Sequence, residues 1–280
     1  MNGLVLGSSY ALVALGLLLV FGVLDIPNFA HGELFMVGAL STAGLASMHD
    51  FPFVLAALTS VLIILVVAFL IDRVAFRPLK DAPHTAVLIA SLAASQLLIQ
   101  GASLVWGTKP FAMANPLPGV LSLGDVRVSY VRLLLIGVVL LGVVAVAWLV
   151  KSTSFGRQMR ALAQNGDAAL LVGINVPRVR VGAFLLGCVL AGAAGALLAG
   201  TQVVSPSIGF QPTLIAFFIL IVAGAGSIWG VVAGAFVVGI IETFAAAYIG
   251  SHLRLTVVFA AVFVFLMVRP EGALAKGKVL

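Results

Sequence analysis

Polar and charged side chains gather in residues 25–33, which read Asp-Ile-Pro-Asn-Phe-Ala-His-Gly-Glu within apolar surroundings. Pro27 and Gly32 interrupt a helix there, and the next helix is expected to begin near Glu33. The first amides of a helix lack intrahelical partners and carry partial positive charge. The pattern therefore predicts a binding site for a carboxylate at the start of that helix.

Three side chains of the segment could complete such a site. Asn28 and His31 can donate hydrogen bonds, and Phe29 offers an apolar wall. Gly32 would let the backbone approach a ligand closely. The alternative is a packing kink at Pro27 and Gly32, with His31 bonded to a neighbouring carbonyl group.

A second group of polar side chains lies within the apolar residues 85–106. These side chains form a strip along roughly one side of a helix: Ser91, Ser95, Gln96, Gln100 and Ser103. A glutamine in lipid would lose its hydrogen bonds, so the strip is expected to face protein or a cavity. Gln96 and Gln100 are thus candidates for a polar path through the membrane, and interhelical hydrogen bonding is the alternative.

Glu242 is an isolated carboxylate in an apolar stretch, flanked by Ile241 and by Phe244. An ionised group at that depth is costly and is usually functional or paired. Arg254 or a partner subunit could neutralise it. A place in the same polar path and a place at a subunit interface are both left open.

Enzymatic sites are not indicated. The chain has neither a His-Glu-x-x-His motif nor a Gly-x-Ser-x-Gly motif. Ser227 and His252 are separated by an apolar stretch, which would place them at opposite membrane faces. His49 and His84 are also dispersed, so we expect neither a catalytic site nor a metal site.

Composition sets the fold class. The chain has 280 residues, of which 62% are hydrophobic and 9% charged, with a mean hydropathy of +1.26. A membrane span needs about 20 apolar residues, and the first stretch has no basic residue before it, so we expect a retained span. We predict an all-α polytopic membrane protein, a single domain over 1–280 with eight or nine transmembrane or partly broken helices. Its candidate stretches are 3–24, 34–48, 53–71, 85–106, 130–150, 181–202, 213–226, 229–249 and 255–268.

Basic residues predict the orientation. Most of them fall in loops that share one side: Arg73, Arg77, Lys80, Lys151, Arg157, Arg160, Arg178, Arg180, Arg269, Lys276 and Lys278. By the positive-inside rule this side is cytoplasmic, so the amino terminus lies outside and the carboxyl terminus inside. Because the cations are spread over loops, nucleic acid is not an expected partner.

Residues 151–180 form the one long polar insertion, and they are arranged as a docking element. Apolar residues recur there at helical spacing: Phe155, Met159, Leu162, Leu170 and Ile174. Arg157 and Arg160 fall on another face. An amphipathic segment resting among lipid headgroups is the alternative interpretation.

Capping residues divide the insertion into two short helices. Thr153 and Ser154 can cap the first helix, and Asn165-Gly166 can end it in a left-handed conformation. Asp167 can cap a second helix over residues 168–172.

A second break, at residues 205–212, contains Pro206, Gly209 and Pro212. Paired broken segments in the two halves of a membrane protein are typical of transporters built from repeats, with the site between the halves. We therefore consider an internal inverted repeat. A stripe of small residues, Gly226, Gly230 and Gly234, is interpreted as a helix-packing surface.

Four motifs, in this order, carry a family resemblance: Asn28-Phe29-Ala30-His31-Gly32, Arg77-Pro78-Leu79, Gly156-Arg157 through Asn165 to Gly173-Ile174, and Gly224-x-Gly-Ser-x-x-Gly. Over nearly the whole chain they resemble the branched-chain amino acid ABC transporter permeases, specifically the LivH-like subunit. Permeases for urea and short amides look similar. Asp167-Ala168-Ala169 with Gly173 also resembles the Glu-Ala-Ala-x-x-x-Gly loop of binding-protein-dependent permeases, with Asp in place of Glu. This resemblance implies that these residues, together with Arg157 and Arg160, couple the insertion to a cytoplasmic ATPase.

The resemblance implies an inner-membrane translocation subunit, without enzymatic activity, that imports branched-chain or other small neutral amino acids. Its implied partners are a second, related permease subunit, two cytoplasmic ATPases that bind ATP and Mg, and a periplasmic binding protein, besides membrane lipid. The chain itself is expected to bind no cofactor. The alternatives are import of urea or short amides by the same machinery, and an ion-coupled carrier or channel.

Overall fold

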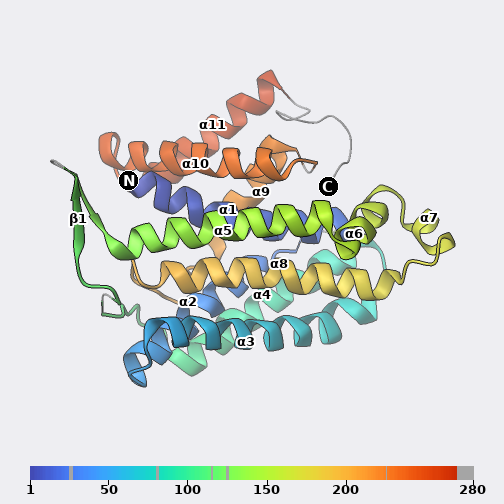
Figure 1. Ribbon diagram of the computed structural model, residues 1–280, viewed down its shortest axis with the longest axis horizontal. Coiled ribbons are helices and arrows are strands. Elements are labelled where there is room, and N and C mark those ends of the chain that lie inside the picture. Colours follow the sequence, from blue (N-terminus) through green and yellow to red (C-terminus); the bar gives the residue numbers. More distant parts are fainter. Residues whose placement is uncertain (25–27, 80–81, 115, 124–125, 225, 270–280) are drawn as a thin grey trace.

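The computed structural model describes residues 1–24, 28–79, 82–114, 116–123, 126–224 and 226–269. Its long helices lie side by side along the long axis of the molecule (Figure 1). A helix overlaps each predicted apolar stretch. These helices are α1 (Asn2–Leu24), α2 (His31–Met48), α3 (Phe53–Ile71), α4 (His84–Trp106), α5 (Tyr130–Ser152), α8 (Val176–Leu198), α9 (Phe210–Ala223), α10 (Ile228–Tyr248) and α11 (Arg254–Val268).

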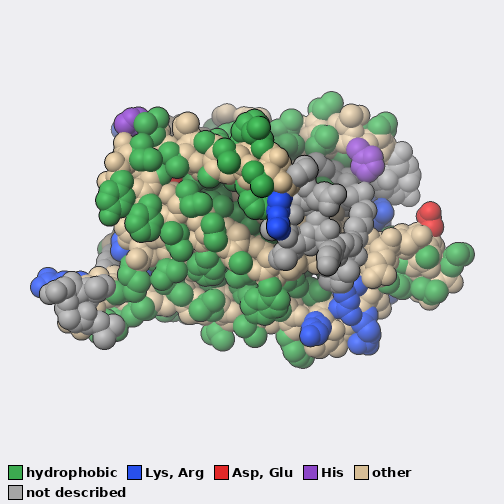
Figure 2. Space-filling model, turned by 90° about the horizontal axis from the view of Figure 1, so that it is seen from above, with side chains coloured by type: hydrophobic (Ala, Val, Ile, Leu, Met, Phe, Trp, Pro, Cys, Tyr) green, Lys and Arg blue, Asp and Glu red, His purple; other side chains and the backbone are tan. Residues whose placement is uncertain are grey.

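Six helical segments in the described part of the chain are long and apolar enough to cross a membrane. They are Asn2–Leu24, Phe53–Leu79, His84–Trp106, Tyr130–Ser152, Val176–Leu198 and Ile228–Tyr248. Helices α9 and α11 have 14 and 15 residues. Hydrophobic side chains cover much of the middle of one face, while Lys and Arg gather mostly toward the two ends of the long axis (Figure 2).

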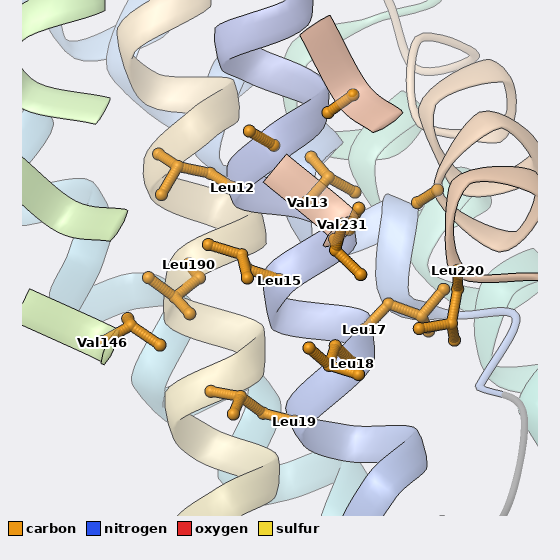
Figure 3. Packing of buried hydrophobic residues seen from close by; sticks show 14 of the residues in the cluster. Leu12, Val13, Leu15, Leu17, Leu18, Leu19, Val146, Leu190, Leu220 and Val231 are labelled. Atoms are coloured by element: carbon orange, nitrogen blue, oxygen red, sulfur yellow. The ribbon is translucent and has the colours of Figure 1, made fainter. Parts of the chain in front are cut away.

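Helix α1 forms the centre of the core and packs against α5, α8, α9 and α10. Leu12, Leu15 and Leu19 of α1 meet Leu190 of α8 and Val146 of α5 in one apolar cluster (Figure 3). Small residues let the backbones come close, as they do in other membrane helix pairs. Gly16 lies against the backbone of Gly187, and Gly7 lies against that of Gly239.

Helix α2 is almost entirely buried between α3, α4, α8 and α9, although it carries His31, Glu33 and several hydroxyl groups. Its hydroxyls find partners inside the bundle. Ser41 donates to the carbonyl oxygen of Val37 at 2.5 Å, and Thr42 donates to Ser60 Oγ at 2.8 Å. Because protein rather than lipid surrounds it, α2 can be less apolar than a lipid-exposed span.

Helix α3 continues into a π-helical segment, η1 (Asp72–Phe76), and a 3-10 turn, η2 (Arg77–Leu79). Both segments lie at the same end of the bundle as the insertion. Figure 1 shows that end opposite the amino terminus.

The insertion contains two short helices, as predicted: α6 (Ser154–Gln164) and α7 (Gly166–Leu171). Thr153 caps α6 by accepting a hydrogen bond from the Gly156 amide at 3.0 Å. The predicted left-handed cap at Asn165-Gly166 is wrong. Asn165 has an extended backbone and itself caps α7, in place of Asp167, by accepting from two amides at 3.0 Å each.

The predicted packing stripe at the start of α10 does not make the closest backbone contact of that helix. A Cβ on Gly234 would make only ordinary contacts, the nearest at 3.4 Å from Ile219. The amide of Gly230 donates to Ser227 Oγ, which caps the helix. The close approach is instead at Gly239, because α10 crosses α1 there.

A β-hairpin in the loop between α4 and α5 was not predicted. Strands β1 (Val120–Leu123) and β2 (Val126–Ser129) pair antiparallel, with Val120 opposite Ser129. Val120, Val126 and Val128 favour a strand, but the run is too short to be recognised within a polar loop.

Candidate functional site

The two breaks in the helical pattern lie against each other. Gly32, in the first turn of α2, faces the carbonyl oxygen of Gly209 and the hydroxyl of Thr213 at the start of α9. A Cβ at Gly32 would collide with both groups. Gly32 therefore serves close packing between α2 and α9, as in the alternative interpretation of its sequence, and leaves no room there for a ligand.

His31 is fully buried and is bonded to α1. Its Nε2 atom lies 3.0 Å from the carbonyl oxygen of Val13. A carbonyl oxygen only accepts, so Nε2 carries the proton. His31 thus holds α2 against α1, which again agrees with the packing alternative rather than with an exposed donor.

Asn28 and Phe29 precede α2. The side-chain oxygen of Asn28 accepts from the Ala30 amide at 3.0 Å, and the Phe29 amide donates to Ser91 Oγ at 3.3 Å. The ring centroids of Phe29 and Phe217 lie 5.2 Å apart. Asn28 Nδ2 is buried without a hydrogen-bond partner among the described residues, so Asn28 keeps a free donor.

Glu33 adds a buried carboxylate that the site hypothesis did not include. Its Oε1 accepts from Ser95 Oγ at 3.1 Å, and within the described chain its Oε2 has no hydrogen-bond partner. A carboxylate in the first turn complements the positive end of α2. In this conformation the carboxyl group of Glu33 itself lies at the end of α2 where the anion site was predicted. Residues 25–27 of the same break lie outside the described residues.

Glu242 has its partners within the chain. Tyr10 donates to Oε2 at 2.8 Å, and Gln211 donates to Oε1 at 3.0 Å. Arg254 lies 3.5 Å from Oε1 and also donates to Gln211 at 3.2 Å. Glu242 is only 1% exposed. Of the two neutralising partners expected from the sequence, Arg254 is the one that lies beside Glu242 within the chain.

The polar strip of α4 divides between two faces. Ser91 and Ser95 are buried and bond toward α2, whereas Gln96 and Gln100 are exposed on the outer surface of the bundle. By comparison, the exposed face of α3 is apolar. The hydroxyl group of Thr59 on this face donates a hydrogen bond to the carbonyl oxygen of Leu55. Exposed glutamines in an apolar span indicate a protein or aqueous neighbour rather than lipid.

The residues predicted to couple the insertion to a motor differ in their surroundings. Arg157, Asp167 and Ala168 are exposed, whereas Ala169 is buried. Arg160 donates to the carbonyl oxygen of Val150 and so caps the end of α5. These positions combine exposed side chains with groups that hold the insertion to the bundle.

The tip of α7 presents its apolar side chains outward. Leu171 is 89% exposed and Val172 75% exposed. Gly173 follows with φ +80°, a left-handed conformation that ends the helix. The amphipathic pattern located these two helices, but it did not predict that Leu170 and Leu171 would face away from the bundle.

Comparison with known proteins decides the family. Residues 1–268 match the family model described as branched-chain amino acid transport system / permease component. This chain belongs to that family. The permease is 32% identical to the high-affinity branched-chain amino acid transport system permease protein BraD of Pseudomonas aeruginosa, over 99% of this chain and 95% of BraD. It is also 32% identical to the LivH permease protein of Escherichia coli, with the same shares covered.

The fold has a solved counterpart. A chain in the structure of PsaBC from Streptococcus pneumoniae in complex with Fab superposes with a TM-score of 0.53. The match covers 96% of this chain and 91% of that chain, at 14% identity, so it concerns the fold alone. The family and the six apolar helical segments together identify a multi-pass protein of the inner membrane.

Proposed function

We propose that the permease is a translocation subunit of an ATP-driven ABC importer for branched-chain or other small neutral amino acids. The observation that carries the proposal is the match to BraD and LivH, which spans 95% of each relative. Import of urea or short amides by the same machinery is the second candidate, because the sequence motifs do not distinguish these substrates.

We further propose that the bundle, as a single domain with eight or nine spanning or broken helices, has its amino terminus outside and its carboxyl terminus in the cytoplasm. The positive-inside rule supports this orientation. The insertion then lies at the cytoplasmic end, opposite the amino terminus (Figure 1). The contact of the two breaks at Gly32 and Gly209 is compatible with an inverted repeat.

The insertion is the proposed coupling element. Leu170, Leu171 and Val172 form an exposed apolar tip on α7 that a groove on a cytoplasmic ATPase would cover. Arg160 and Thr153 donate hydrogen bonds to carbonyl oxygens at the end of α5 and so hold α6 to α5. Movement of the tip would therefore also move α5. ATP and Mg would bind the ATPase subunits and not this chain.

The outer face of α4 is the proposed contact with a second, related permease subunit. Gln96 and Gln100 lie there, and they would either bond across that interface or line the substrate path between the subunits. A periplasmic binding protein would deliver the amino acid at the opposite end from the insertion. Glu242 remains a proposed residue of that path, with its carboxyl group paired within the chain.

The proposal is tested by transport. The complete complex, reconstituted in vesicles with its binding protein, should take up labelled leucine in an ATP-dependent manner. Uptake of urea in place of leucine would reassign the substrate and retain the importer. Uptake that continues without ATP and follows an ion gradient would contradict the ABC assignment and favour an ion-coupled carrier.

A further inference from the structure

A cavity of about 610 Å³ opens at the insertion end of the bundle. Its walls come from the last turns of α1, the end of α3 with η1 and η2, the start of α4 and the start of α8. Deep in the cavity the walls are apolar. Val20, Phe76 and Phe184 are buried there, and the two phenylalanine rings meet edge to face at 5.4 Å.

The rim of the cavity is cationic. Arg77, Arg178 and Arg180 line it and are exposed, whereas Asp72 is the one acidic residue among the described residues that line it. Guanidinium groups bind phosphate oxygens in a bidentate manner, and they do so better than ammonium groups. Three arginines around one opening therefore favour a ligand with a phosphate group.

Asn28 supplies an independent sign of a ligand. It also lines the cavity, is 2% exposed, and its Nδ2 has no hydrogen-bond partner in the described chain. A buried amide donor without a partner costs free energy, so a bound acceptor oxygen would be favourable. The cavity thus offers cations at its rim, one polar donor inside and apolar walls.

We propose that this cavity binds an anionic glycerophospholipid. Arg77, Arg178 and Arg180 hold the headgroup phosphate, Asn28 donates to an ester carbonyl oxygen, and an acyl chain enters along the apolar walls. Basic pockets between membrane helices bind anionic headgroups in this way. A free phosphate would leave the apolar walls unfilled. A small amino acid would occupy only part of the volume, which lies in the range for drug-sized ligands.

The proposal is independent of the transported substrate and is tested on the full chain, delipidated in neutral detergent. Native mass spectrometry would titrate phosphatidylglycerol, with phosphatidylcholine, inorganic phosphate and leucine as comparison ligands. Phosphatidylglycerol should bind with a stoichiometry of one, and phosphatidylcholine much more weakly. The double substitution Arg178→Gln with Arg180→Gln should weaken the affinity by about thirtyfold, at about 1 kcal/mol for each basic residue.

Two further variants distinguish binding in the cavity from general attraction of the lipid to positive charge. Arg73→Gln removes an exposed arginine of η1 that does not line the cavity, and it should leave phosphatidylglycerol binding unchanged. Val181→Trp keeps all three arginines but fills the cavity, and it should abolish lipid binding.

Four results would overturn the proposal. They are equal binding of the two lipids, an equal loss in Arg73→Gln and in the double variant, undiminished phosphatidylglycerol binding in Val181→Trp, and displacement of the lipid by leucine. The last result would identify the cavity as part of the route of the amino acid.

Discussion

Gly32 and Gly209 hold the two broken segments of the chain in backbone contact. A Cβ built on either glycine would meet the carbonyl oxygen of the other, so α2 and α9 approach more closely there than any side chain would allow. A Cβ on Gly209 would also lie 2.6 Å from Oε2 of Glu33. The start of α9 thus packs directly against Gly32 and Glu33 in the first turn of α2.

Gly32→Ala is therefore expected to destabilise the permease. The methyl group meets backbone and the Thr213 side chain, and over-packing of this kind costs about 1–3 kcal/mol. Thermal unfolding in detergent measures the loss. Gly101→Ala on α4 is the matched control, because a Cβ there meets nothing within 4 Å and should slightly favour the helix. Equal melting temperatures for the two variants would contradict the close contact.

Glu242→Leu should destabilise the single chain. The change leaves Tyr10, Gln211 and Arg254 without their shared acceptor, at about 1–3 kcal/mol for buried groups left unsatisfied. Glu242→Gln retains an acceptor and should cost less. The measurement is unfolding of the isolated permease, without other subunits. A defect that emerges only in the assembled complex would favour the subunit-interface interpretation.

Leu171→Asp is expected to uncouple the ATPases without destabilising the bundle. Leu171 is 89% exposed, so its replacement should change stability by about 0.5 kcal/mol or less, while the charge disfavours an apolar groove. Co-purification of the ATPases and transport-stimulated ATP hydrolysis are measured. Leu121→Asp, on the hairpin at the opposite end, is the control. The coupling role is excluded if both variants keep full stimulation. Arg160 is a poorer target, because its loss would also uncap α5.

Gln96→Leu with Gln100→Leu should reduce assembly with the second permease subunit, or transport by the assembled complex, or both. The stability of the isolated chain should hardly change, because both glutamines are exposed on α4. Thr59→Val, a polar-to-apolar change on the outer face of α3, is the control and should affect neither property. Normal assembly and uptake in the double variant would show that this face borders lipid.

Local patterns in the sequence predicted local features well. Apolar runs located the helices, and Thr153 marked the start of α6, because burial of an apolar run and capping by a hydroxyl depend on neighbours in sequence. Family motifs predicted the family. The hairpin was missed because its strands have four residues each, too few to establish a period.

What only the tertiary structure decided is how these helices are rotated against one another. Tyr10, Gln211 and Arg254 are scattered along the sequence, yet they converge on Glu242. Likewise, Gln96 and Gln100 point outward while Ser95 of the same helix points inward. A helix rotation decides which side chain is buried, and it depends on close contacts such as those of Gly16 with Gly187 and Gly32 with Gly209. Such contacts join residues distant in sequence, so no pattern within one segment encodes them.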